Sequence, residues 1–144
     1  MTCSSLEHKV TALNFELGKI LAVALGGAFG ASLRYLVAAT THGLLGHAFP
    51  YGTLLVNTLG SLLIGYLVVL LPDAGSQGSM LRLLLITGLL GGFTTYSAFS
   101  IETLTLLQEG QLLKAGLNIA LTLFSCLLAV WIGFLLARAV HVPH

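Results

Sequence analysis

Four long apolar stretches, joined by short connections, constrain this chain more than any other feature of its sequence. Each is close to or longer than the ~20 residues that an α-helix needs to cross the hydrocarbon core of a bilayer. The connections carry helix-breaking residues, including Pro50, Pro72 and Gly110. The pattern predicts an all-α integral membrane protein with four transmembrane helices, over about residues 20–40, 53–71, 80–107 and 113–137.

The composition supports a membrane protein. Hydrophobic residues make up 56% of the 144 residues and charged residues only 8%, whereas soluble domains carry roughly 25% charged residues. Much of the surface must therefore face membrane lipid, which is an expected partner. The connections are too short to hold a soluble domain. We expect one membrane domain at residues 18–138, between a polar N-terminal tail at 1–17 and a C-terminal tail at 139–144.

Several classes of function find no support in the sequence. The net charge of +1 gives no basic face for nucleic acid. The five histidines and two cysteines show no metal-ligand spacing, and Cys3 and Cys126 are expected to be free thiols. No nucleotide-binding glycine motif and no nucleophile–base pair is visible. The sequence therefore does not indicate an enzyme.

Small residues recur at a spacing of four in every apolar stretch. Lipid supplies no hydrophobic drive for helix association, so helices in a membrane gain contacts by close backbone approach at such residues. Four helices enclose little volume, so any pore is expected to need a second subunit. The pairs are Gly26 and Gly30, Ser61 and Gly65, Gly88 and Gly92, and Ala129 and Gly133.

Polar side chains interrupt the first and second stretches, and polar groups in a membrane span are functional candidates by default. Arg34 is either an interfacial anchor beside Tyr35 or a fixed positive charge that draws anions into a vestibule. Asn57 either hydrogen-bonds to a neighbouring helix or donates an amide hydrogen to a dehydrated anion. The residues alone leave both choices open.

Residues 87–102, TGLLGGFTTYSAFSIE, carry the strongest functional signal. Two glycines followed by Thr94 and Thr95 make a poor helix interior, so the third helix is predicted to break there. Irregular backbone at membrane depth is tolerated only where it is buried in protein or lines a cavity. The carbonyl groups that such a break frees would suit a small cation.

Aromatic and hydroxyl side chains alternate directly after the predicted break. Tyr96 and Phe99 share one helix face, beside the hydroxyl pair Ser97 and Ser100. An aromatic ring has a positive edge, which can favour an anion without a formal charge. The pattern suits a small, strongly hydrated ion whose water shell must be replaced by several weak donors.

Three segments, GGAFGASLRY, GTLLVN and TGLLGGFTTYSAFSIE, resemble in order and separation those of the Fluc (CrcB-type) fluoride channels. The likeness covers about residues 18–138. It implies a fluoride-specific channel for passive efflux, which lowers cytoplasmic fluoride and its toxicity. It also implies an antiparallel, dual-topology homodimer in the cytoplasmic (inner) membrane, with a structural Na⁺ at the dimer interface.

The resemblance further implies roles for particular residues. Asn57 matches an asparagine that hydrogen-bonds fluoride, and Tyr96 and Phe99 match two aromatic residues whose ring edges face the ion. Gly91 and Thr94 match positions whose backbone carbonyls hold the Na⁺. The remaining candidates are the pore hydroxyls Ser97, Ser100, Thr122 and Ser125, the vestibule charge Arg34 and the motif carboxylate Glu102.

Two positions depart from the family pattern. Tyr96 stands where phenylalanine is most often found, and Ala98 stands where threonine is frequent. The tyrosine hydroxyl adds a polar tip to the pathway, and the alanine removes one hydroxyl from the motif. Both changes concern conductance and block, and neither contradicts a channel.

Two other classes of protein remain as alternatives. A small four-span proton-coupled exporter would need a membrane carboxylate, and Glu102 is the only acidic residue within a stretch. A non-transporting scaffold would explain the small residues but not the hydroxyl–aromatic segment. The basic residues divide four to two between the sides of the membrane, a weak bias that admits insertion in either direction. The four are Lys9, Lys19, Arg82 and Arg138, and the two are Arg34 and Lys114.

Overall fold

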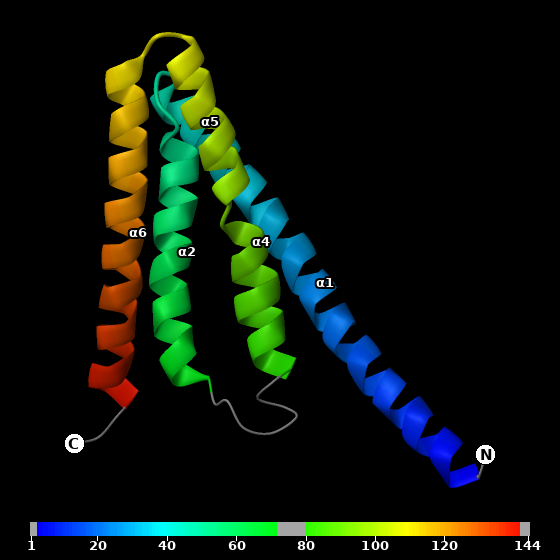
Figure 1. Ribbon diagram of the computed structural model, residues 1–144. Helices are drawn as coiled ribbons and strands as arrows, with labels where there is room; N and C mark the ends of the chain where they lie inside the picture. Colours follow the sequence, from blue (N-terminus) through cyan, green and yellow to red (C-terminus); the bar gives the residue numbers. More distant parts are fainter. Residues whose placement is uncertain (1–2, 72–79, 142–144) are drawn as a thin grey trace.

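The computed structural model describes residues 3–71 and 80–141, with side chains described from residue 13 onward. All regular structure within these ranges is helical (Figure 1). Four stretches are long and apolar enough to cross a membrane: Leu13–Leu45, Tyr51–Leu70, Met80–Gln108 and Leu112–His141. The predicted all-α architecture with four spanning helices is confirmed. The predicted turn at Pro72 lies outside the described residues.

The elements are α1 (Cys3–Leu45), α2 (Tyr51–Leu70), the π-helical η1 (Leu83–Leu90), α4 (Gly91–Phe93), α5 (Tyr96–Gln108) and α6 (Leu112–His141).

Helices α2 and α6 run side by side and touch through their backbones (Figure 1). A side chain at Gly65 would collide with the backbone of Val130, and one at Gly133 would collide with the backbone of Leu62. Only glycine permits this separation, and close approach is how helices gain contacts without a hydrophobic drive. The packing role predicted for the second and fourth stretches is therefore confirmed for Gly65 and Gly133.

Helix α1 crosses the bundle obliquely and packs on η1 and α4 (Figure 1). The two glycines of its small-residue pair, Gly26 and Gly30, face the backbone of Leu84 and Leu89, and Gly88 faces Gly26 in return. This pairing of glycine with glycine confirms the packing role predicted for the first and third stretches. The N-terminal segment predicted as a polar tail is helical from Cys3 and continues into α1.

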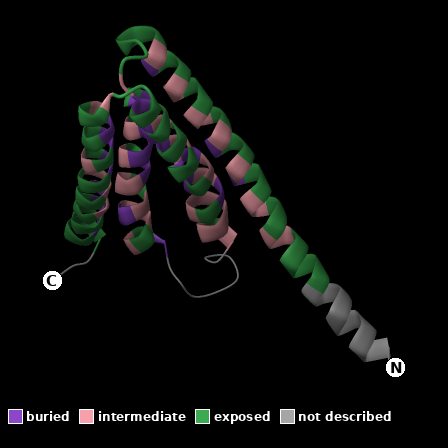
Figure 2. Cartoon of the chain, turned by 45° about the horizontal axis from the view of Figure 1, so that its top comes forward, coloured by how far each residue is buried: buried purple, intermediate pink, exposed green. Residues whose placement is uncertain are grey.

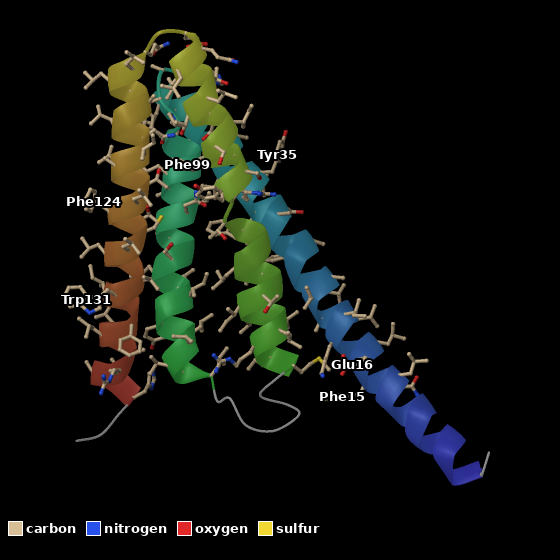
Figure 3. The ribbon with its side chains drawn as sticks, in the orientation of Figure 1. Phe15, Glu16, Tyr35, Phe99, Phe124 and Trp131 are labelled. Atoms are coloured by element: carbon tan, nitrogen blue, oxygen red, sulfur yellow. The ribbon has the colours of Figure 1, made fainter. Side chains whose placement is uncertain are left out.

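Large apolar side chains cover the outside of the bundle. Figure 2 shows buried residues mainly on the inner faces of the helices. Figure 3 shows Phe124 and Trp131 pointing outward from α6, and these side chains are 75% and 60% exposed. Only 17% of the residues in the most apolar 18-residue segment of α6 are buried. Such a surface has to be covered by lipid or by another protein chain.

The third spanning helix is broken, as predicted, and the break falls on two threonines. Thr94 (φ −82°, ψ 158°) and Thr95 (φ −154°, ψ 114°) are extended between α4 and α5. The preceding glycines stay helical. Gly92 lies so close to the backbone of Gly27 that no side chain fits there, so its contribution is close packing against α1. The π-helical geometry of η1 was not predicted from the sequence.

Candidate functional site

The backbone break is held by a side-chain amide on the neighbouring helix. Asn57 of α2 is 8% exposed. Its Oδ1 accepts a hydrogen bond from the backbone N–H of Thr95 at 2.7 Å, and its Nδ2 donates to the carbonyl of Thr95 at 3.0 Å. These two bonds satisfy a buried peptide group that has left the helical pattern. Because Nδ2 carries two hydrogens, one donor of Asn57 is left over for another acceptor.

The same bonds release two carbonyl groups from the helical pattern. In an unbroken α-helix, the N–H of Thr95 would bond to the carbonyl of Gly91, and the N–H of Ala98 to that of Thr94. Here the first N–H donates to Asn57, and the second donates to Oγ1 of Thr95 at 3.1 Å. The carbonyls released are those of Gly91 and Thr94, which the resemblance to fluoride channels implies as cation ligands. Carbonyl oxygens are donors of the kind that hard cations prefer.

Thr95 also caps the start of α5. Its hydroxyl accepts from Ala98 and lies 3.2 Å from the hydroxyl of Ser97. A threonine at this position satisfies one of the N–H groups that every helix start leaves unpaired. The cap fixes the direction in which α5 leaves the break, and with it the positions of the aromatic side chains that follow.

A groove with several polar residues in its lining opens beside the break, between α2, α6 and the start of α5. Its volume is about 210 Å³. The hydroxyl oxygen of Thr122 is buried and has no hydrogen-bond partner among the described residues, so it is available to a guest. The groove brings together four of the predicted site residues. It is lined by Asn57, Ser61, Ile64, Thr94, Thr95, Tyr96, Thr122 and Cys126.

The two predicted aromatic residues lie together on α5, with ring centroids 5.3 Å apart and planes tilted by 53°. Phe99 is 7% exposed, and Figure 3 shows it on the part of α5 next to α2. Tyr96 is 76% exposed and borders the groove. A tilted pair turns the edge of one ring toward the other, so ring edges are presented in more than one direction.

Glu102 lies one helical turn beyond Phe99 and is tied to α2. One of its carboxylate oxygens accepts a hydrogen bond from the Thr53 hydroxyl at 2.7 Å. The other carboxylate oxygen is buried and has no partner among the described residues. Thr53 is one turn before Asn57 on α2, so this carboxylate lies about one helical turn from the groove residue Asn57.

The structure places other predicted residues away from the groove. Ser125 is bonded to Thr58 at 2.8 Å and lines a separate pocket with the C-terminal part of α1. Ser100 is exposed and donates to the Tyr96 carbonyl within its own helix. Arg34 is partly buried on α1 and forms no ion pair or hydrogen bond with any described residue. Ser97 is exposed and meets the site only through Thr95.

A buried asparagine on α6 was not predicted from the sequence. Asn118 is 1% exposed and donates to the Thr103 hydroxyl at 2.9 Å. That hydroxyl donates in turn to the Phe99 carbonyl at 2.7 Å. The signal was available, because an amide in an apolar span is costly wherever it occurs. Cys126, which lines the groove, gave no comparable signal, because cysteine is common in apolar interiors.

Comparison with known proteins assigns the sequence to a family. The family model described as "CrcB-like protein, Camphor Resistance (CrcB)" matches residues 21–134. The chain belongs to the CrcB family. The matched range contains the break, the groove and every candidate site residue named above.

Relatives of this CrcB chain are named "Fluoride-specific ion channel FluC". The protein of Methylococcus capsulatus is 46% identical over 123 residues, which are 85% of this chain and 54% of that protein. The protein of Hydrogenovibrio crunogenus is 40% identical over 130 residues, 90% of this chain and 98% of its own length. The protein of Geobacter sulfurreducens is 44% identical over 119 residues, 83% of this chain and 96% of its own length. The chain thus spans about half of the first relative and nearly all of the other two.

Proposed function

We propose that this CrcB chain is a fluoride-specific ion channel that carries fluoride passively out of the cell. The observation that carries the proposal is the groove, where a spare amide hydrogen of Asn57, the unpaired hydroxyl of Thr122 and the ring of Tyr96 meet beside a broken helix. All three are weak, uncharged donors to an anion. The relatives named as fluoride-specific channels support the same function.

Fluoride has to lose much of its water to pass a narrow pore, and weak donors arranged along the path replace that water. The Asn57 amide and the Thr122 hydroxyl offer conventional hydrogen bonds. The edges of Tyr96 and Phe99 then offer a positive field without a fixed charge. Because no single donor binds the ion tightly, the ion can leave as easily as it enters. Arg34 lies outside the groove, and its positive charge raises the local concentration of anions from a distance.

The channel assembles as an antiparallel homodimer of multi-pass subunits in the cytoplasmic membrane. Two features support this assembly. The groove is open along one side of a single chain, so a second chain is needed to close it into a pore. The weak division of basic residues admits both orientations in the membrane.

A structural Na⁺ would lie at the interface between the two chains. The carbonyls of Gly91 and Thr94, which the bonds at Thr95 and Ala98 release from the helix, would hold it. When bound, the cation supplies positive charge that holds two broken helices together. These carbonyl groups suit Na⁺, because hard cations prefer oxygen ligands.

The test is fluoride efflux from liposomes that contain the purified protein, recorded with a fluoride electrode, with chloride-loaded vesicles as the control. The proposal expects rapid fluoride release and no chloride release. Absence of fluoride release from well-folded protein in Na⁺-containing buffer would reject it.

A further inference from the structure

A second pocket lies beyond Glu102, at the end of the bundle where the α1–α2 and α5–α6 connections meet (Figure 1). Its volume is about 200 Å³, and its lining combines two imidazoles with two carboxylates. His42 and His47 come from the end of α1 and the connection after it, Glu102 comes from α5, and Glu109 directly follows α5. The rest of the lining is Phe49, Pro50, Thr105 and Leu106.

The turn that ends α1 builds the pair of imidazoles. Gly46 has φ +75°, and its N–H donates to the carbonyl of His42 at 2.9 Å. Glycine in this left-handed conformation commonly ends a helix and reverses the chain. The reversal brings the ring of His47 to 4.8 Å from the ring of His42, centroid to centroid. The pairing of the two histidines is therefore a consequence of the turn.

Glu102 connects this pocket to the groove. It lines the pocket and is also bonded to Thr53, which lies one helical turn from Asn57. An ion held in the pocket would thus be about one turn of α2 from the first amide donor of the groove. The pocket is therefore close to the Asn57 end of the groove.

The charge of the pocket depends on its histidines. With both imidazoles neutral, Glu102 and Glu109 give the pocket a net negative charge, which repels anions. Histidine is the side chain that ordinarily changes charge between pH 5 and 8. Each proton taken up by His42 or His47 cancels one unit of that negative charge.

Building on the proposed channel function, we propose that this pocket is a proton-dependent anion-binding vestibule, which takes fluoride when His42 and His47 are protonated. Glu102 and Glu109 are the other titratable groups in its lining. Gln111 donates to the carboxylate of Glu109 at 2.6 Å, which leaves its charge unchanged. The titratable residues Arg34 and Tyr35 of α1, Tyr51 of α2 and Lys114 of α6 are on neighbouring elements but do not line the pocket.

The first experiment compares fluoride efflux from proteoliposomes at about pH 5.5 and about pH 7.5, with subsaturating fluoride and with protein-free vesicles as background. The unmodified chain should release fluoride roughly fivefold faster at the lower pH, because the local anion concentration follows the local potential. The double variant His42→Asn and His47→Asn should lose this dependence. The matched control is His141→Asn, whose histidine bonds to Tyr66 near the C-terminus of α6 and should keep it.

The variant Glu102→Gln distinguishes the effect of the carboxylate on efflux from the effect of the histidines. It removes the charge that Glu102 carries when ionised, so efflux at the higher pH should rise while the part of the pH dependence that comes from the histidines remains. An unchanged pH profile in the double histidine variant would overturn the vestibule. No efflux from the unmodified chain at either pH would count against the channel itself.

A binding measurement tests the vestibule without transport. The imidazole nitrogen signals are followed by NMR against pH, in detergent, with fluoride or with gluconate at the same ionic strength. If protonation favours fluoride, then fluoride must favour protonation by the same factor. The titration midpoints of His42 and His47 should move upward with fluoride and that of His141 should not. Midpoints that fluoride does not move would overturn the site.

Discussion

Asn57 binds both polar groups of the Thr95 residue, accepting from its N–H at 2.7 Å and donating to its carbonyl at 3.0 Å. One side chain therefore holds the break in the third spanning helix. The same geometry orients the amide so that its remaining hydrogen is left for another acceptor. Structural support and ion contact are thus combined in one residue, and substitutions there will affect both.

Asn57→Ala should lower the stability of the protein by about 1–3 kcal/mol, because the buried N–H and carbonyl of Thr95 lose their partners. Thermal unfolding in detergent measures the change. Ser32→Ala is the matched control, since Ser32 is exposed and bonds only within α1. Equal melting temperatures for the two variants would show that Asn57 does not hold the break.

Phe99→Ile should reduce fluoride efflux about tenfold, the equivalent of ~1.4 kcal/mol at the highest barrier, because the aliphatic side chain has no positive edge to offer. The protein should remain folded, since isoleucine fills most of the same space. Phe124→Ile is the control, because Phe124 points outward from α6 and is 75% exposed (Figure 3). Undiminished efflux in the Phe99 variant would remove the ring-edge argument.

Replacement of Na⁺ by a large organic cation on both sides of the membrane should impair efflux and weaken the dimer. The carbonyls of Gly91 and Thr94 would then face one another without a cation. Efflux and size-exclusion chromatography, both with and without Na⁺, are the measurements. Full activity without Na⁺ would reject the cation site.

Gly65→Ala should destabilise the bundle by about 1–3 kcal/mol, the usual cost of overpacking, because the new methyl group would meet the carbonyl of Val130. Gly116→Ala is the contrasting substitution, since a methyl group there would meet no atom of the described residues within 4 Å. It should stabilise α6 by about 0.5–1 kcal/mol through helix propensity alone. Similar effects of the two substitutions on thermal unfolding would refute the close contact of α2 with α6.

Glu102→Gln distinguishes a channel from a proton-coupled exporter. A channel should retain downhill fluoride efflux in this variant, whereas an exporter would lose transport together with the carboxylate of the third span. Efflux is measured with and without an imposed proton gradient. Loss of all transport, with the protein still folded, would favour the exporter.

The parts of the fold that depend on local chemistry were predictable. Apolar length located the spanning helices, and small residues at a spacing of four located their contacts. The break was predicted from the weak helix propensity of residues 91–95, but its position on Thr94 and Thr95 depends on a bond from Asn57 of another helix. No local pattern encodes such a bond.

The candidate site was predicted less completely, for a similar reason. The orientation of α6 about its own axis decides that Thr122 and Cys126 face the groove and that Ser125 faces Thr58. A helix that is apolar on all sides carries no amphipathic pattern from which this rotation can be read. Asn118 was overlooked although the rule applied to Asn57 applies equally to it.

The break at Thr94 and Thr95 divides the dipole of the third spanning helix into two. A continuous helix has one positive end and one negative end, far apart at its termini. Interrupting it in the middle creates two new ends a few residues apart: the negative C-terminal end of α4 and the positive N-terminal end of α5. The first suits a cation and the second suits an anion. Two uncharged threonines thereby give this membrane protein opposite polarities at the same depth, without a single ionised side chain.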